Sequence, residues 1–473
     1  MTSAASISAV KSSISDALRS QIANLRGEFA DKLAALVGIP SVSMEPDRRA
    51  DVRRTAELAC SYLRDSGADA NLVETRGLPL VLGQIVQDPS FPTLTIYNHL
   101  DVQPADRVDK DGWKTDPFVL QAMGDRYYGR GATDDKGPAL TALFAVRLAL
   151  AAKVKLNFQF LWECEEEVGS PSFAGALAEL VKTRKLRTDS IVVSDTIWPS
   201  ATQPAIPVGL RGLLAFVIRL QTGEKAVHSG TTGGAARNPI GELAALIAAC
   251  YDARTGKVLI PGFYSGIRKV SASERAELGR AGFSGKSFKN AHGLRSVRFA
   301  SDARLREAIM IHPTFEVHGI VGGYSGPGVK TIVPHAAEAK LSCRLVPGQK
   351  PKEVFDRIKR FVAKKCPDAE IVFDAALEPY LADSKGPFLQ AARTAVQETF
   401  GLRAAMTREG GSIGAVVTMA ATLGKEVVLL GLSLPEDGYH AINESFSWRQ
   451  AEGGMAMFYQ YFQHLASMPP DAR

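Results

Sequence analysis

The stretch Thr93-Leu-Thr-Ile-Tyr-Asn-His-Leu-Asp-Val-Gln-Pro104 decides the fold, because an apolar run ends there in polar side chains. Residues 93–97 have the composition of a buried strand, and Pro104 forbids a long continuation. Open α/β sheets bind their ligands at such strand ends. His99 and Asp101 point to one side of an extended chain. The carboxylate can therefore orient the imidazole, or both side chains can bind a ligand as a pair. A strand end with a hydrogen-bonded histidine explains the same residues equally well.

Strands and helices alternate on both sides of this stretch, which predicts an α/β structure with a mostly parallel central sheet flanked by helices. Between 208 and 382 the order of strands and helices predicts an inserted α+β sandwich of the ferredoxin-like kind. We therefore expect one domain from residues 1–207 and 383–473, interrupted by a smaller domain at 208–382. Strands are predicted at 71–74, 80–86, 156–162, 190–194, 213–220, 314–320, 336–345, 369–373, 404–407 and 427–430, and helices at 14–37, 47–66, 137–152, 172–186, 238–250, 351–365, 388–400, 412–422 and 445–464.

Composition excludes several classes of protein. A chain of 473 residues with a net charge of +6 and scattered basic residues lacks the basic, aromatic stripe of a nucleic-acid-binding protein. No apolar run is long enough to span a bilayer. The five cysteines are far apart, without a C-x-x-C, which argues against a disulfide framework and fits a reducing compartment. Residues 1–15 lack the apolar segment of a signal peptide. We expect a soluble cytoplasmic protein.

A second motif, Tyr128-Gly-Arg-Gly-Ala-Thr-Asp-Asp-Lys-Gly137, places two adjacent aspartates just before a buried helix. Aspartate is a favoured helix N-cap, and acidic residues suit the positive end of a helix. Capping explains one aspartate more easily than two. We expect one of Asp134 and Asp135 to cap the helix and the other to point into a cleft.

A third motif, Trp162-Glu-Cys-Glu-Glu-Glu-Val-Gly-Ser170, carries four glutamates directly after an apolar strand. A solvated acidic loop is the usual explanation of such a charge run. Crowded carboxylates raise one another's pKa unless a cation neutralises them. A bound metal would do so and would leave one glutamate free as a general base.

Two further candidates complete a possible metal site. Asp195 closes the strand at 190–194, and His440 lies in a polar segment at 435–444. Mixed histidine and carboxylate ligands suit Zn²⁺, with Mn²⁺ or Co²⁺ as alternatives. Two histidines with three or more carboxylates are the ligands of a two-metal hydrolase.

These motifs together resemble the aminoacylase/carboxypeptidase-type di-zinc metallopeptidases, and within that family the carnosinase and cytosolic non-specific dipeptidase branch. The resemblance runs in order from about residue 14 to the C-terminal helix. It implies a zinc-peptidase-like catalytic domain and an inserted lid and dimerisation domain. The motifs that carry it are His99-Leu-Asp-Val-Gln-Pro, Gly129-Arg-Gly-Ala-Thr-Asp-Asp-Lys-Gly, Glu166-Glu-Val-Gly-Ser, Ser194-Asp, His228-Ser-Gly and the late Gly-x-His.

The resemblance implies a role for each matching residue at the metals. Asp134 bridges two divalent ions, with His99 and Asp195 on one, and Glu167 and His440 on the other. Glu166 is the general base for a metal-bound hydroxide, and Asp101 orients His99. The family also implies a cis peptide between Asp134 and Asp135.

The resemblance also implies a substrate site. His228 acts in trans from the partner subunit of a homodimer and stabilises the oxyanion. Arg344 binds the substrate carboxylate, a task that suits a planar bidentate donor. Gly411 and Ser412, at a predicted helix start, hold the same carboxylate, and Thr331 adds a hydroxyl contact. Tyr439 departs from the branch, which usually has a small residue before the ligand histidine, and Gly414 departs as well.

We therefore expect a metal-dependent hydrolase of short peptides, chiefly dipeptides with a free C-terminal carboxylate. The same site in an N-acyl-amino-acid amidohydrolase is the alternative, and a metal-poor homologue that binds without catalysis is a third reading. The intact ligand set argues against the third. The sequence assigns no role to residues 261–300, which are only weakly periodic.

Overall fold

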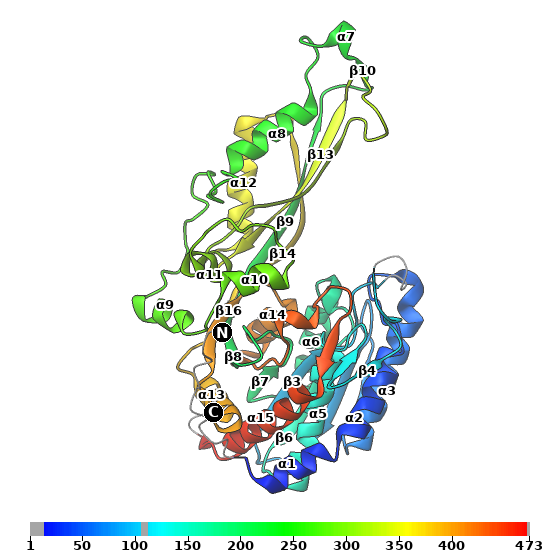
Figure 1. The fold of residues 1–473 in the computed structure, drawn as a ribbon, viewed down its shortest axis with the longest axis vertical. Coiled ribbons are helices and arrows are strands. Elements are labelled where there is room, and N and C mark those ends of the chain that lie inside the picture. Colours follow the sequence, from blue (N-terminus) through cyan, green and yellow to red (C-terminus); the bar gives the residue numbers. More distant parts are fainter. Residues whose placement is uncertain (1–13, 106–111, 471–473) are drawn as a thin grey trace, which may run out of the picture.

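The computed structural model describes residues 14–105 and 112–470. Most of the segment 1–15, on which the expectation of no signal peptide rests, lies outside the described residues. Figure 1 shows a lower part built around the central sheet and an elongated upper part that carries a second sheet. No helix in the described ranges combines the length and the hydropathy needed to cross a bilayer.

The central sheet has the strand order β1-β2-β6-β3-β7-β17. The four strands from β6 to β17 are parallel, and β1 and β2 extend the sheet as an antiparallel edge. Because parallel strands end at one edge, residues that follow β3, β6 and β7 are brought together there. The bounds in sheet order are β1 (Asp69–Val73), β2 (Leu80–Ile85), β6 (Asn157–Glu163), β3 (Thr93–His99), β7 (Ser190–Val193) and β17 (Val427–Leu429).

Helices cover both faces of this sheet because successive side chains of each strand point to opposite faces. On β7, for example, Val192 belongs to one buried cluster while Ile191 and Val193 belong to another. The helix α5 (Lys136–Ala151) is buried almost all round, as expected for a helix that is apolar on every face. The same face carries α1 (Asp16–Ala23), α2 (Arg26–Val37), α3 (Arg49–Asp65), α13 (Pro387–Phe400) and α15 (Trp448–Ala466), and the other carries α6 (Phe173–Lys182) and α14 (Gly414–Leu423).

The second sheet is antiparallel and has the order β11-β13-β9-β14. With α8 and α12 packed on it, this is the strand order of the split βαβ sandwich, so the expected fold class is confirmed. Its tip, at the far end of the molecule in Figure 1, consists of β10, α7 and β12. The bounds are β9 (Gly212–Gln221), β10 (Val227–His228), α7 (Ser229–Thr232), α8 (Pro239–Cys250), β11 (Glu316–Gly322), β12 (Ile332–Val333), β13 (Ala336–Leu345), α12 (Pro351–Lys365) and β14 (Glu370–Leu377).

Short elements join the two parts. One small sheet is β15-β8-β16, and another is β18-β5-β4. The weakly periodic segment after residue 260 folds into α9, α10 and α11, and α9 and α11 contact β16. The bounds are β4 (Gln121–Met123), β5 (Arg126–Tyr128), β8 (Ala205–Leu210), α9 (Ala272–Gly279), α10 (Gly285–Ala291), α11 (Asp302–Met310), β15 (Tyr380–Leu381), β16 (Ala405–Glu409), β18 (Ser445–Ser447), η1 (Pro46–Arg48), η2 (Glu166–Val168) and η3 (Pro435–Asp437).

Three predicted helices differ from the structure by three residues or more, and the one expected over 172–186 ends at Lys182. The helix expected over 14–37 is two helices, broken at Asn24 and Leu25. Asparagine favours helix ends because its side chain competes for backbone hydrogen bonds. The last helix begins three residues later than expected, because 445–447 pair with β5 and Ser447 caps the helix.

Candidate metal centre and active site

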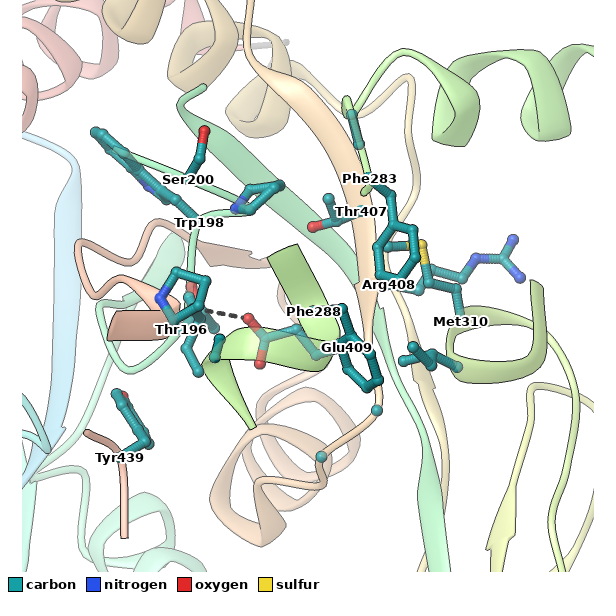
Figure 2. A pocket seen from close by; sticks show the side chains of 18 of the residues that line it. Thr196, Trp198, Ser200, Phe283, Phe288, Met310, Thr407, Arg408, Glu409 and Tyr439 are labelled. Carbon is teal, nitrogen blue, oxygen red and sulfur yellow. Dashed lines mark hydrogen bonds between the residues drawn. The ribbon is translucent and has the colours of Figure 1, made fainter. Parts of the chain in front are cut away.

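The predicted metal ligands lie at a chamber of about 770 Å³. Asp134, Asp195 and His440 line it, together with Glu166. Figure 2 shows part of its wall, with Tyr439 on one side and Met310 on the other. His99 is the last residue of β3, and the glutamates and Asp195 follow β6 and β7. The parallel strands therefore deliver these side chains to one edge of the sheet.

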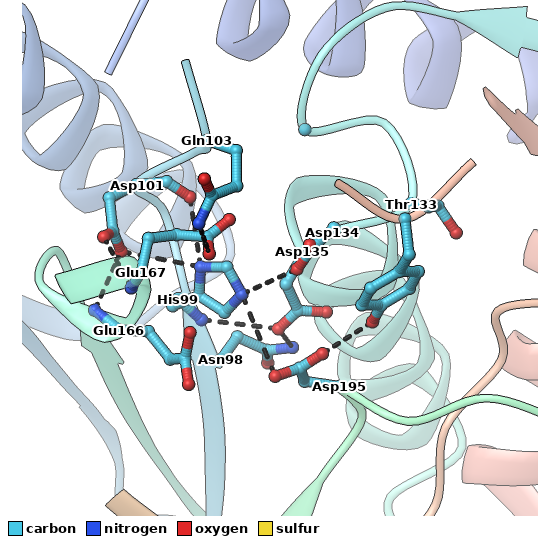
Figure 3. A network of polar contacts seen from close by, with 12 residues as sticks. Asn98, His99, Asp101, Gln103, Thr133, Asp134, Asp135, Glu166, Glu167 and Asp195 are labelled. Atoms are coloured by element: carbon cyan, nitrogen blue, oxygen red, sulfur yellow. Dashed lines mark hydrogen bonds and ion pairs between the residues drawn. The ribbon is translucent and has the colours of Figure 1, made fainter. Parts of the chain in front are cut away.

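One group of ligands consists of His99, Asp134 and Asp195, all buried. The imidazole Nε2 of His99 lies 3.0 Å from Asp134 Oδ1 and 3.8 Å from Asp195 Oδ2. Figure 3 shows these side chains converging from three different segments. Their ligand atoms all lie within 4.8 Å of one another, which is close enough to share one ion.

A second group consists of Asp134, Glu167 and His440. The Nε2 atom of His440 lies 3.1 Å from Asp134 Oδ2 and 3.2 Å from Glu167 Oε2. The two groups therefore share Asp134, and each histidine faces a different oxygen of its carboxylate. A carboxylate placed in this way can bridge two ions. The structure thus brings together all five residues expected to bind metal.

The loop that carries Asp134 is held by a residue to which the sequence assigned no role. The buried carboxylate of Glu444 accepts hydrogen bonds from the backbone N–H groups of Gly131, Thr133 and Asp134, at 2.9, 2.9 and 3.0 Å. Arg130 Nη1 donates to the same carboxylate at 2.8 Å. The peptide between Asp134 and Asp135 is cis, as the family resemblance implied.

Asp135 occupies the N-cap position of α5, but its side chain makes no capping hydrogen bond. Its Oδ2 instead accepts from Asn98 Nδ2 at 2.7 Å, and Asn98 also donates to Ser194 Oγ at 2.5 Å. The expectation that one of the two aspartates caps the helix through its side chain is therefore wrong. Both carboxylates face the strand ends, because the buried Asn98 needs a partner.

Asp101 organises the glutamate turn as well as His99. Its Oδ1 lies 3.5 Å from His99 Nδ1, while its own backbone carbonyl is closer to that nitrogen, at 3.0 Å. The backbone N–H groups of Glu166 and Glu167 donate to the Asp101 carboxylate at 3.2 and 3.0 Å. Ser43 donates to it at 2.6 Å. One buried carboxylate thus fixes a metal-ligand histidine and the turn that presents both glutamates.

Burial and close contact between charged groups change the pKa values of several residues in the site. Burial, with the neighbouring Asp195 and Glu167, raises the pKa of Glu166 well above its usual range, although His99 opposes the rise. Burial also raises the pKa of Asp195 to about 6. Hydrogen bonds to Asp134 and Glu167 raise the pKa of His440 to about 10. Burial acts to raise the pKa of Asp134, but hydrogen bonds from the two histidines outweigh it and lower the pKa.

The residues present fit a pair of divalent cations. Glu167 Oε1 is buried without a hydrogen-bond partner among the described residues, so one potential ligand atom is uncommitted. Clustered carboxylates of raised pKa are stabilised in their charged form by a nearby cation. Two histidines and three carboxylates are ligands that Zn²⁺, Mn²⁺ or Co²⁺ accept.

Comparison with known proteins places this geometry in a family. Residues 95–464 match the model of peptidase family M20/M25/M40. The chain belongs to this family. The matched region begins within β3 and ends within α15, so it includes both ligand groups and the inserted sheet.

Relatives of this M20 peptidase cover nearly its whole length. It is 32% identical over 467 residues to the Beta-Ala-His dipeptidase of Homo sapiens, covering 93% of this chain and 90% of that protein. It is 31% identical over 474 residues to the Cys-Gly metallodipeptidase dug1 of Schizosaccharomyces pombe, covering 96% and 99%. The crystal structure of human carnosine dipeptidase 1 superposes with a TM-score of 0.84 at 29% identity, covering 96% and 99%. The predicted family, its branch and the class of metallopeptidase hydrolase are confirmed.

The residues expected to bind substrate in the M20 peptidase divide into two sets. Arg344 Nη1 donates to Ser412 Oγ at 3.0 Å, and Gly411 lines the chamber beside Ser412. Ser412 in turn donates to the backbone carbonyl of Arg211. These three predicted residues therefore lie together, next to the start of α14.

His228 and Thr331 lie elsewhere, at the tip formed by β10, α7 and β12. His228 is exposed, and its Nδ1 accepts a hydrogen bond from Gly230 N at 2.9 Å. Thr331 accepts from Ser229 N through its backbone carbonyl at 3.0 Å. Figure 1 shows this tip at the far end of the molecule from the central sheet. Within one chain, the structure does not bring these two residues to the metal ligands.

Sequence reasoning missed three contributors to the site. Glu444 lies four residues after His440, but a glutamate in a polar turn carries no signal of burial. Tyr439 was noted only as a departure, yet its hydroxyl donates to Asp195 Oδ1 at 2.6 Å. Glu409 lies two residues before Gly411, but the sequence predicts no role for its side chain, which lines the chamber wall. Each of these roles depends on contacts between segments far apart in the chain.

Proposed function

We propose that this M20 peptidase hydrolyses dipeptides that have a free C-terminal carboxylate. Two divalent ions, for which Zn²⁺ is the first candidate, would bind at Asp134. The observation that carries this proposal is the carboxylate of Asp134, which faces a histidine through each of its oxygens. The relatives that support the substrate class are named as dipeptidases for Beta-Ala-His and Cys-Gly.

The ligands to the ions would be His99 and Asp195 with Asp134 on one side, and Glu167 and His440 with Asp134 on the other. Bound there, the ions would polarise the peptide carbonyl and lower the pKa of a water molecule. Glu166 then accepts a proton from the attacking water and gives it to the leaving amine nitrogen. The C–O bond forms first and the C–N bond breaks second, so the products are a carboxylate and an amine. Burial raises the proton affinity of Glu166, which suits a group that must hold this proton between the two steps.

The substrate carboxylate would bind to Arg344, Ser412 and the backbone at Gly411. The contact between Arg344 and Ser412 supports this assignment, because it places a guanidinium beside a helix N-terminus, and both attract anions. Requiring a carboxylate next to the scissile bond would limit cleavage to the last peptide bond of a substrate.

We further propose that the enzyme works as a homodimer in which His228 of one subunit, with Thr331, reaches the active site of the other. Three exposed apolar residues of the inserted domain, Ile320, Val321 and Val329, support a protein contact there. Two of them lie on β11, an edge strand that could pair with a second chain. The domain limits at 207/208 and 382/383 and the cytoplasmic location stay predictions of the same kind.

A substrate panel with metal analysis tests the proposal. The metal-loaded protein is assayed on dipeptides and on the matching N-acetylated amino acids, and bound metal is counted per chain. We expect higher kcat/KM on the dipeptides and two divalent ions per chain. Faster turnover of the acetylated set would assign an N-acyl-amino-acid amidohydrolase instead. Protein that binds no metal under any loading condition would contradict both.

A further inference from the structure

The chamber extends well beyond the metal ligands, and its far wall is largely apolar. Ile197 and Trp198 follow β7, Phe283 and Phe288 come from α10 and the turn before it, and Met310 ends α11. Figure 2 shows the rings of Trp198, Phe283 and Phe288 around one space. The wall is therefore built largely by the segment after residue 260, to which the sequence assigned no role.

Two glutamates line the chamber apart from the residues at the predicted metal site: Glu436 is exposed, whereas Glu409 is set into this wall. Glu409, the last residue of β16, lines the chamber, and its Oε1 accepts from Ile197 N at 2.8 Å. Figure 2 shows it between Thr196 and Phe288. Among the described residues it takes part in no ion pair, and burial raises its pKa to about 8. Glu409 is half-buried, and a carboxylate partly removed from water without a cation beside it is destabilised, so this position favours a ligand that brings a positive charge.

The position of Glu409 orients a dipeptide in the chamber. In its charged form Glu409 would repel the C-terminal carboxylate of a substrate, which has Arg344 as a partner instead. Arg344 does not line the chamber itself but bonds to Ser412, which does, so the sites for the two ends of a dipeptide lie along the turn from Glu409 to Ser412. The opposite end of a dipeptide is an ammonium group, and it complements Glu409.

We propose that this chamber binds the N-terminal residue of the substrate, with Glu409 pairing its ammonium group and Trp198, Phe283 and Phe288 contacting a large apolar side chain. The proposal rests on the dipeptidase function proposed above and deepens it. The substrate class is a dipeptide with a free amino terminus and an aromatic or large aliphatic first residue. Aromatic walls favour such a side chain because ring contacts add to the burial of apolar area.

A substrate series at constant C-terminal glycine tests the side-chain preference. We expect kcat/KM for Phe-Gly to exceed that for Ala-Gly at least tenfold, a ratio typical of apolar specificity pockets. Phe288→Ala should lower this ratio several-fold. Phe299→Ala, which removes an aromatic ring of the same segment outside the chamber wall, is the control and should leave the ratio unchanged. An equal kcat/KM for the two dipeptides overturns this part of the proposal.

Glu409→Gln tests the pairing with the amino terminus, because glutamine keeps an acceptor for Ile197 N and removes the charge. We expect KM for Phe-Gly to rise about tenfold or more, with a smaller change in kcat. The preference for Phe-Gly over N-acetyl-Phe-Gly should also decline. An equal loss on both substrates would mean that Glu409 only supports the fold, and it would overturn the assignment.

Binding of L-phenylalaninamide separates this subsite from the proposed reaction. This probe has the ammonium group and the ring but no carboxylate and no scissile peptide bond between residues. We expect calorimetry on the metal-loaded protein to detect it, with affinity at least tenfold above L-alaninamide and N-acetyl-L-phenylalaninamide, and loss of binding in Glu409→Gln. Such binding without dipeptide hydrolysis would reject the reaction and keep the subsite. Hydrolysis of dipeptides without selective binding of L-phenylalaninamide would keep the reaction and reject the subsite.

Discussion

The edge of the central sheet and the tip of the inserted domain both carry residues predicted to act in one reaction. The predicted metal ligands lie together at the sheet edge, whereas the residues at the tip lie far from them (Figure 1). At the sheet edge, His99 and His440 lie within 3.1 Å of Asp134, and most of the ligand set is buried. At the tip, His228 is exposed and bonded to its own turn. The parallel sheet assembles the first region from one chain. The residues at the tip do not reach the predicted metal ligands among the described residues of the same chain.

This difference separates two ways of building an active site. Strands β3, β6 and β7 converge by topology, so any chain with this fold brings their ends together. A long antiparallel sheet carries the tip away from that edge (Figure 1). A residue at the tip can act on substrate only if a second subunit or a domain movement brings it close. The following predictions test this contrast, from the largest expected effect to the smallest.

Replacing Glu166 by alanine should give the largest loss, because this removes the proton acceptor and leaves the five metal ligands in place. We expect kcat to decrease by about a thousandfold or more, with two metal ions per chain retained. Steady-state kinetics and metal analysis measure the two quantities. Loss of metal in this variant would instead mean that the roles of Glu166 and Glu167 are exchanged. Glu179→Gln, an exposed substitution on α6, serves as the control.

His228→Ala should lower kcat by about a hundredfold through loss of an oxyanion contact, while metal content stays the same. Mixing this variant with Glu166→Ala under conditions of subunit exchange should restore activity. Each mixed dimer would contain one site with an intact glutamate and an intact histidine from the partner. If the mixture is no more active than either variant alone, the tip does not act between subunits.

Tyr439→Phe should weaken metal binding at the sheet edge, because the tyrosine hydroxyl donates to Asp195 at 2.6 Å. Residues that orient metal ligands typically contribute tenfold to a hundredfold in affinity. Competition with a chelator, measured on the unloaded protein, gives the affinity directly. Unchanged affinity would show that this contact does not position Asp195.

Glu409→Gln should change the pH dependence of stability. Burial raises the pKa of Glu409 from its usual 4.5 to about 8, so the folded state binds a proton that the unfolded state has released between these values. Stability from this group is therefore present at low pH and is lost as the pH rises toward 8. The difference in unfolding free energy between the two proteins should change by about 1.4 kcal/mol per pH unit in this window. Denaturant titrations of both proteins at pH 5.5, 6.5 and 7.5 measure this difference. The same difference at all three pH values would contradict a raised pKa of Glu409.

Much of this arrangement could be predicted from short-range patterns. His99, Asp134, Glu167 and Asp195 each follow or precede a strongly apolar element, and strand or helix ends of that kind are visible in sequence. The ferredoxin-like order of the inserted domain followed from the same periodicity. The predicted fold class was confirmed because burial patterns with periods of two and 3.6 residues are local properties.

Other features could not be predicted in this way. The helices α10 and α11 have weak periodicity, since they pack against β16 and η3 rather than in a regular layer. The hydrogen bonds of Glu444, Tyr439 and Asp101 join segments separated by tens to hundreds of residues. The walls of the chamber come from several such segments, among them 195–200, 281–292, 309–310, 407–413 and 435–440.

The amino-acid sequence was enough to predict the main alternation of strands and helices, the candidate metal ligands and the family. The folded chain alone decided which oxygen of Asp134 faces each histidine, where Glu409 lies, and how far His228 is from the sheet edge. The physical reason is that residue type and periodicity are local, whereas distances between side chains depend on how remote segments pack. Packing also determines which buried charges find a partner, and thus where a ligand must supply one.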